Sequence, residues 1–264
     1  MTGLAERSRR YVLREMRRIE GYLDPCDALV IRSLLLFQDE SRIDGGGAEI
    51  GVLYGRSYFL LRTLMPRAPV LALDNFNTGR REDGSTRQRE IFAENGRRLD
   101  LPVDDALVFE GDSTTLPPDY ALEKVGPIRF FSVDGGHQYH HVQQDARMAL
   151  TALHEGGVIA FDDYSNYEWP MVTAAIFDFL RAESETVAPF AATRKKLYVC
   201  RRARHAAYQD HVRRSPYLGG FRSEERKLFD DRIAVVHQSS AQRAAYELLN
   251  RAGLGRFSSL VYSA

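Results

Sequence analysis

Short apolar runs alternate with segments of helical periodicity through the middle of the chain, from residue 45 to residue 201. Apolar runs bounded by glycine, proline and polar residues predict strands. The predicted strands are Gly47–Gly51, Val70–Asp74, Ala106–Glu110, Ile128–Asp134, Val158–Phe161, Val187–Ala191 and Lys196–Arg201. The segments between them predict helices over Ser57–Leu64 and Ser85–Leu99, a helix that is broken at Gly156–Gly157, and a helix that begins at Pro170. Strands joined by helices of this length predict a parallel α/β sheet covered on both faces.

The two ends of the chain show other patterns. Residues 6–18 place six arginines among apolar residues and predict an amphipathic helix with a basic face, which we expect to pack on the domain or on a second subunit. Cys26–Phe37 predicts a strongly apolar second helix, and residues 202–264 predict helices and loops without a strand. We therefore expect an N-terminal helical segment over 1–40 that forms a lid or an oligomer contact, an α/β domain over 41–201, and a helical C-terminal appendage over 202–264.

The composition excludes several classes of protein. The 264 residues carry 36 Lys and Arg against 36 Asp and Glu, which gives no reason to expect a nucleic-acid or membrane partner. Two cysteines are too few for a disulfide framework. No apolar run approaches the ~18 residues of a membrane-spanning helix, and the first twenty residues lack the apolar core of a secretory signal. We expect a cytoplasmic protein.

Ligands of open parallel sheets bind beyond the carboxyl ends of the strands, so the residues after each strand are the candidate site residues. The first strand is followed by a glycine turn, and its segment includes Glu49, Gly51, Gly55 and Ser57. Glycines here allow a ligand to approach the backbone and the N–H groups of the next helix, although a plain tight turn is an equal alternative. Leu53 stands where the dinucleotide fingerprint has its second glycine. Asp74, after the second strand, is placed to bind both hydroxyls of a ribose.

Polar residues also follow the next three strands. Asp112 and Ser113 come after the third strand and are placed to bind an adenine amino group. Asp134 follows the fourth strand, and Asp162 and Asp163 follow the fifth. Three carboxylates at one sheet edge need a cation, a proton or an arginine between them, and an all-oxygen set favours a hard cation such as Mg²⁺. The alternative is that these residues cap helices and that one of them pairs with an arginine.

A histidine lies three residues after Asp134. An imidazole titrates near neutrality, so His137 is a candidate general base for a hydroxyl proton, the alternatives being a helix cap or a metal ligand. His140 and His141 are expected to face solvent or to lie behind the metal ligands.

These motifs, in this order, resemble the class I S-adenosylmethionine-dependent methyltransferases. Among these they look like the metal-dependent O-methyltransferases of natural-product sugars, the group with the macrocin, mycinamicin and novobiocin enzymes. The resemblance covers roughly residues 40–200 and implies a Rossmann-like seven-stranded sheet of order 3-2-1-4-5-7-6 with strand 7 antiparallel. It makes 41–201 the S-adenosylmethionine-binding domain. Mycinamicin-type members have a histidine base where this chain has His137, whereas novobiocin-type members have an Asp where it has Gly136.

The resemblance also implies a role for each candidate residue. The cofactor would lie over Gly51–Gly55, and the residues implied in binding it are Glu49, Gly51, Gly55, Ser57, Asp74, Asp112, Ser113 and Asp134. Mg²⁺ would be held by Asp134, Asp162 and Asp163, and His137 would accept the proton. We therefore expect an S-adenosylmethionine- and Mg²⁺-dependent O-methyltransferase acting on a small-molecule hydroxyl, a sugar or phenolic group of a natural product. We also expect a homo-oligomer. The alternatives are a nicotinamide-dependent oxidoreductase and a non-catalytic binding protein with this fold.

Overall fold

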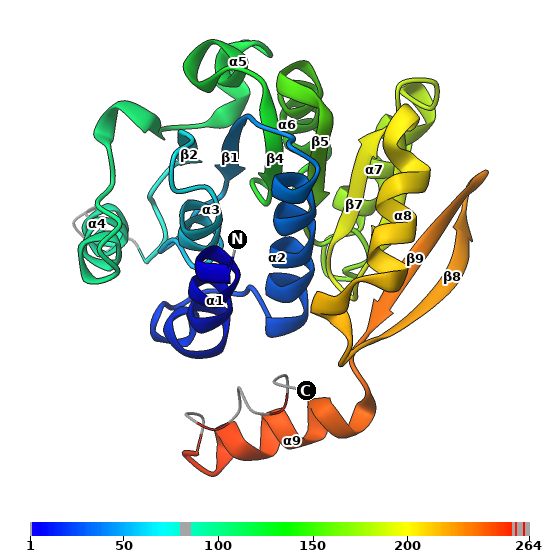
Figure 1. Ribbon diagram of the computed structural model, residues 1–264. Helices are drawn as coiled ribbons and strands as arrows, with labels where there is room; N and C mark the ends of the chain where they lie inside the picture. The colour runs from blue at the N-terminus through cyan, green and yellow to red at the C-terminus, as the bar shows by residue number, and fades with distance from the viewer. Residues whose placement is uncertain (1, 80–85, 255–256, 258–260, 262–264) are drawn as a thin grey trace.

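A single mixed sheet runs through the computed structural model, which describes residues 2–79, 86–254, 257 and 261 (Figure 1). Its strands in the described residues are β1 (Gly46–Ile50), β2 (Val70–Asp74), β3 (Val108–Glu110), β4 (Ile128–Val133), β5 (Leu153–Phe161), β6 (Val187–Ala192), β7 (Leu197–Arg201), β8 (Arg222–Leu228) and β9 (Asp231–His237). The spatial order is β3-β2-β1-β4-β5-β7-β6-β9-β8. β1 to β5 are mutually parallel, and β7 is antiparallel to both β5 and β6. The predicted order of the first seven strands is confirmed.

Helices cover both faces of this sheet, as Figure 1 shows. The α-helices of the described residues are α1 (Thr2–Arg10), α2 (Pro25–Glu40), α3 (Tyr58–Leu64), α4 (Gln88–Arg98), α5 (Tyr120–Val125), α6 (Tyr139–Ala152), α7 (Pro170–Ala182), α8 (His205–Arg214) and α9 (Ser240–Arg251). α1, α2, α3 and α8 bury one apolar cluster against the sheet, and α5, α6 and α7 bury a second against its other face. The predicted Rossmann-like α/β fold is confirmed. None of the described helices has the length and apolar character needed to cross a membrane.

The N-terminal segment packs closely on the domain. The predicted amphipathic helix is α1 followed by a wider π-helical turn over Tyr11–Glu15 and a tighter 3-10 turn over Met16–Arg18. Tyr11 and Met16 are buried against the domain, and the Tyr11 hydroxyl donates to the Arg56 carbonyl at 2.6 Å. Asp24 accepts a hydrogen bond from the Asp27 N–H and caps the N-terminus of α2.

Three predictions about elements need correction. Residues 202–264 were expected to lack strands, but β8 and β9 form an antiparallel hairpin, and β9 pairs in parallel with β6. The sheet therefore has nine described strands, not seven, and the appendage is not wholly helical. Gly156–Gly157 do not break a helix: α6 ends at Ala152, and both glycines lie inside β5. The helix expected over Ser85–Leu99 begins at Gln88, and Ser85 itself lies outside the described residues.

Candidate active site

Backbone hydrogen bonds hold the carboxyl ends of the first five strands level with one another. The Gly51 N–H donates to Leu73 at 2.8 Å, and the Gly111 N–H donates to Asp74 at 2.9 Å. The Asp134 N–H donates to Ile50, and the Asp162 N–H donates to Val133, each at 3.0 Å. The residues that follow each strand therefore meet along one edge of the sheet, as the sequence predicts.

Gly51 is required where β1 turns out of the sheet. Its φ is +84°, in the left-handed region that favours glycine. A Cβ atom at this position would lie 1.8 Å from the Asp134 carbonyl oxygen, so no larger residue fits there. Gly55 meets a different constraint, because a Cβ there would run into Phe59 and Phe92. Gly51 thus lets the turn pass close to the backbone of Asp134 at the wall of a pocket, and Gly55 lets it pack against the aromatic core.

That pocket has a volume of about 940 Å³. It is large enough for a nucleotide-sized ligand together with a second small molecule. The predicted site residues along its wall are Gly51, Ser57, Asp74, Asp112, Ser113, Asp134, His137, Asp162 and Asp163. Glu49 and Gly55 are not among the described residues that line it. Glu49 lies below the wall, where burial raises the pKa of its carboxyl group to about 7.

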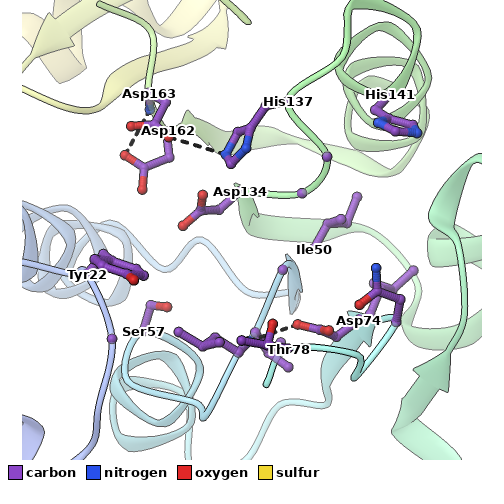
Figure 2. A pocket seen from close by; sticks show the side chains of 18 of the residues that line it. Tyr22, Ile50, Ser57, Asp74, Thr78, Asp134, His137, His141, Asp162 and Asp163 are labelled. Carbon is purple, nitrogen blue, oxygen red and sulfur yellow. Dashed lines mark hydrogen bonds and ion pairs between the residues drawn. The ribbon is translucent and has the colours of Figure 1, made fainter. Parts of the chain in front are cut away.

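Asp74 forms one end of the pocket in Figure 2. Its Oδ2 accepts the Leu53 N–H at 2.8 Å, and its Oδ1 accepts the Phe76 N–H at 2.7 Å and the Gln88 amide at 3.0 Å. Burial nevertheless raises the pKa of Asp74 above its ordinary value. The carboxylate is therefore held in one orientation at the position predicted for a ribose.

Asp112 and Ser113 line the wall of the same pocket. Asp112 caps the short turn over Ser113–Thr115 through the Thr114 N–H, at 2.9 Å, and this hydrogen bond lowers the pKa of Asp112. The Ser113 hydroxyl donates to Asp145 at 2.7 Å. Asp145 is buried in α6, and burial raises its pKa to about 7.

The predicted acidic residues gather at the other end of the pocket. Asp134, His137 and Asp163 each offer one ligand atom, and these atoms lie within 4.8 Å of one another. Figure 2 shows the His137 ring turned toward Asp163, and His137 Nε2 lies 3.3 Å from Asp163 Oδ2. The hydrogen bond with His137 keeps the pKa of Asp163 below its ordinary value. Asp163 Oδ1 accepts the Asn166 amide at 3.0 Å.

Asp162 lies beside this group but has a different partner. Its Oδ2 lies 2.9 Å from the Nζ atom of Lys196, and both side chains are almost fully buried. Burial disfavours the charged form of Asp162, but Lys196 and a hydrogen bond with Asp134 together lower its pKa. Burial, and then the negative charge of Asp162, raise the pKa of Asp134 well above its ordinary value. Lys196 is not among the site residues that the sequence predicts.

Two ring contacts lie near the acidic end of the pocket, one between Trp169 and His137 and one between His140 and His141. Trp169 stacks on His137 with the ring centres 4.3 Å apart and the planes 16° apart. His141 lines the pocket but lies away from Asp163 in Figure 2, and its ring contacts that of His140 with the ring centres 4.1 Å apart and the planes tilted by 50°. Neither His140 nor His141 joins the cluster of Asp134, His137 and Asp163.

The residues at the acidic end fit a divalent cation. Two carboxylates and one imidazole converge from the ends of β4 and β5, and carboxylate oxygens are the donors that hard divalent cations prefer. Desolvation and the neighbouring Asp162 raise the pKa of Asp134, so a positive charge placed beside it would favour its carboxylate form.

Comparisons with known proteins agree with the fold. Residues 48–164 match a family model described as a methyltransferase domain. The chain carries a methyltransferase domain. This match begins within β1, ends just after β5 and includes the glycine turn, Asp74 and the acidic residues, so the predicted methyltransferase domain is confirmed over these residues.

Solved structures show the same fold. The O-methyltransferase NovP superposes with a TM-score of 0.53 at 16% identity, over 67% of this chain and 78% of that protein. MycE, a methyltransferase of the mycinamycin biosynthetic pathway solved with Mg and SAH, gives a TM-score of 0.50 at 16% identity. This chain spans 53% of the length of MycE, and 75% of this chain is covered. A protein of Acanthamoeba polyphaga mimivirus, R132, is 40% identical over 50 residues, 19% of this chain and 23% of that protein.

Asp74 provides a direct test of the cofactor end of the pocket. We expect Asp74→Ala to weaken the binding of S-adenosylhomocysteine by about 1–3 kcal/mol, the range for hydrogen bonds to a charged group. Isothermal titration calorimetry measures this loss. Gln88→Ala is the matched control, because it removes one internal partner of Asp74 and leaves the carboxylate in place. Equal affinity in Asp74→Ala and the wild type would remove Asp74 from the cofactor site.

Proposed function

We propose that this methyltransferase transfers the methyl group of S-adenosylmethionine to a hydroxyl group of a small molecule, with a divalent cation, Mg²⁺, held between Asp134 and Asp163. The single observation that carries this proposal is the layout of the pocket. The cluster of Asp134, His137 and Asp163 forms one end, and Asp74 and the glycine turn form the other. A donor bound at one end and an acceptor bound at the other would meet between them.

Each side chain has a definite task in this reaction. Asp74 would bind the ribose hydroxyls, and the turn at Gly51 would let the cofactor lie against the backbone. A bound cation would lower the pKa of a coordinated acceptor hydroxyl. His137 Nε2 lies 3.3 Å from Asp163 Oδ2, and in the tautomer that donates its Nε2 hydrogen to Asp163 the Nδ1 lone pair would accept the hydroxyl proton. The developing sulfide is neutral, so holding the oxygen in line with the methyl group matters more than stabilising charge.

The open side of the pocket supports an acceptor with a flat or ring-shaped group. Trp169 and Tyr22 both line it, with exposed fractions of 40% and 80%. Lys195 lies over the Tyr22 ring at 5.9 Å. Aromatic faces at such a position stack on sugar rings and on phenols, and two adjacent oxygens of either group suit a cation with open positions. We propose a sugar or phenolic group of a natural product as the acceptor. The pathway named for MycE and the O-methyl transfer named for NovP are consistent with this class.

Binding and metal removal test this proposal. We expect S-adenosylmethionine and its demethylated product to bind the protein and NAD to fail, as measured by calorimetry. Methyl transfer to a catechol or sugar panel should stop after treatment with EDTA and return when Mg²⁺ is added, because the acceptor hydroxyl would lose the cation that lowers its pKa and holds it in place. NAD binding would favour the oxidoreductase alternative. Full turnover by exhaustively chelated protein would contradict the metal-assisted reaction.

A further inference from the structure

Lys196 brings a permanent positive charge into the acidic end of the pocket. It directly precedes β7, and β7 runs antiparallel to β5, with Leu197 paired to Phe161. The beginning of β7 therefore lies beside the end of β5, and Lys196 meets Asp162. The side chains of the two residues are 3% and 9% exposed, and Nζ and Oδ2 are 2.9 Å apart.

Both oxygens of Asp162 are occupied by partners from this chain. Oδ2 contacts Lys196, and Oδ1 accepts the N–H of Asp163 at 3.0 Å. Asp163 has a φ of +55°, an unfavourable conformation for a residue with a side chain. The Asp162 carboxylate thus holds the backbone of Asp163 in the conformation that points the Asp163 side chain at His137.

The turn that carries Lys196 is itself anchored in the core. Thr193 Oγ1 accepts the Lys196 N–H at 3.0 Å, and the Thr193 N–H donates to the Lys196 carbonyl at 2.9 Å. The Thr193 hydroxyl donates in turn to Asp27, which is buried near the start of α2. This anchorage leaves the ammonium group little freedom to move away from Asp162.

We propose that Lys196 is the permanent counter-ion of Asp162, and that Asp162 positions Asp163 while Asp134 and Asp163 supply the carboxylate ligands of the cation. A buried ammonium group and a divalent cation repel one another and compete for the same carboxylate oxygen. Removing Asp162 from Lys196 would leave a buried positive charge without a partner, which is strongly unfavourable. This inference rests on the proposed function, because it assigns the ligands of the proposed cation. It removes Asp162 from the predicted set of metal ligands and keeps Asp134 and Asp163.

Manganese binding separates ligands from positioning residues. Replacing Asp162 alone would leave Lys196 without its ion-pair partner, so the test variant is the double substitution Asp162→Ala with Lys196→Met. This variant removes both charges and also removes the Oδ1 atom that accepts the Asp163 N–H. We expect its Kd for Mn²⁺, followed by the EPR signal of the free ion, to stay close to that of the wild type. We expect Asp134→Asn and Asp163→Asn each to raise this Kd by about tenfold or more, because each removes a charged ligand.

Activity supplies the second readout. The double variant should lose roughly 10–100-fold in kcat, the usual effect of removing a group that orients a metal ligand. The matched control removes another ion pair, the partly buried pair of Asp39 with Arg129, through Asp39→Asn and Arg129→Gln. It should change neither kcat nor the Kd for Mn²⁺. Retention of wild-type kcat by the Asp162 and Lys196 variant would overturn the positioning role.

The possible failures are distinguishable. Loss of Mn²⁺ binding in the Asp162 and Lys196 variant, with S-adenosylhomocysteine binding and circular dichroism intact, would show that Asp162 is a ligand and would overturn this inference alone. Absence of Mn²⁺ binding in the wild type, with turnover unaffected by EDTA, would overturn the proposed metal-assisted function and this inference together.

Discussion

Replacing Asp134 with Asn should abolish most of the methyl-transfer activity and leave the cofactor affinity essentially unchanged. The substitution keeps the size of the side chain and the backbone carbonyl against Gly51, but it removes one charge from the cluster of Asp134, His137 and Asp163. A bound metal ion supplies several kcal/mol of transition-state stabilisation, and each ~1.4 kcal/mol is a factor of ten in rate. We expect kcat to fall by about 10³-fold or more, as measured with a radiolabelled methyl donor.

Calorimetry with S-adenosylhomocysteine is the control for Asp134→Asn. Most of the predicted contacts to the cofactor come from the ends of β1, β2 and β3, so its Kd should stay near the wild-type value. A variant that loses cofactor binding and activity in parallel would place Asp134 in the cofactor site alone. A variant with near-normal kcat would remove the cation from the mechanism.

His137→Ala is the second large expected effect. A positioned general base contributes about 10²–10⁴-fold, so kcat should fall by that factor with little change in the affinity for S-adenosylhomocysteine. A protonated imidazole cannot accept the hydroxyl proton, so the wild-type rate should fall as the pH falls. The pH–rate profile of His137→Ala should lack this acidic limb. Trp169→Phe is the matched control, because it keeps an aromatic ring against His137.

Two results would contradict this role of His137. Near-normal turnover in His137→Ala would remove it as the base. Loss of activity together with a large loss of Mn²⁺ affinity would make it a metal ligand, which its place within 4.8 Å of the two carboxylate ligand atoms also permits.

The sequence predicts the central part of the fold because that part depends on local pattern. Val70–Asp74 and Ile128–Val133 are mainly apolar, and the structure buries them in inner strands of the sheet. The polar residues after these strands meet at one edge because parallel strands end together. Asp74, Asp134, His137 and Asp163 are therefore found in one pocket, as the sequence predicts.

The hairpin of β8 and β9 escapes prediction for a physical reason. Arg222–Leu228 is an edge strand whose side chains are exposed on both faces except near its end, so it has no alternation of apolar and polar residues. Charged residues are common on edge strands because they discourage pairing with other chains. β9 has apolar residues, but its place beside β6 depends on a contact distant in sequence.

Lys196 and Asp145 escape prediction because their roles depend on tertiary contacts. Lys196 reaches Asp162 only because β7 is antiparallel to β5, and no spacing in the sequence shows this. A lysine at the start of a strand expected to be antiparallel was the available signal. Asp145 lies on the buried face of α6 with its carboxylate on Ser113, and a carboxylate on an apolar helical face was the corresponding signal.

A crystal structure of the protein soaked with S-adenosylhomocysteine and Mn²⁺ tests the central claim most directly. We expect the ribose of the ligand to lie on Asp74 and an anomalous manganese peak to be bonded to Asp134 and Asp163. The open coordination positions of the metal should face Trp169. A ligand bound outside this pocket, or a manganese peak that avoids both carboxylates in crystals that contain the ligand, would contradict it.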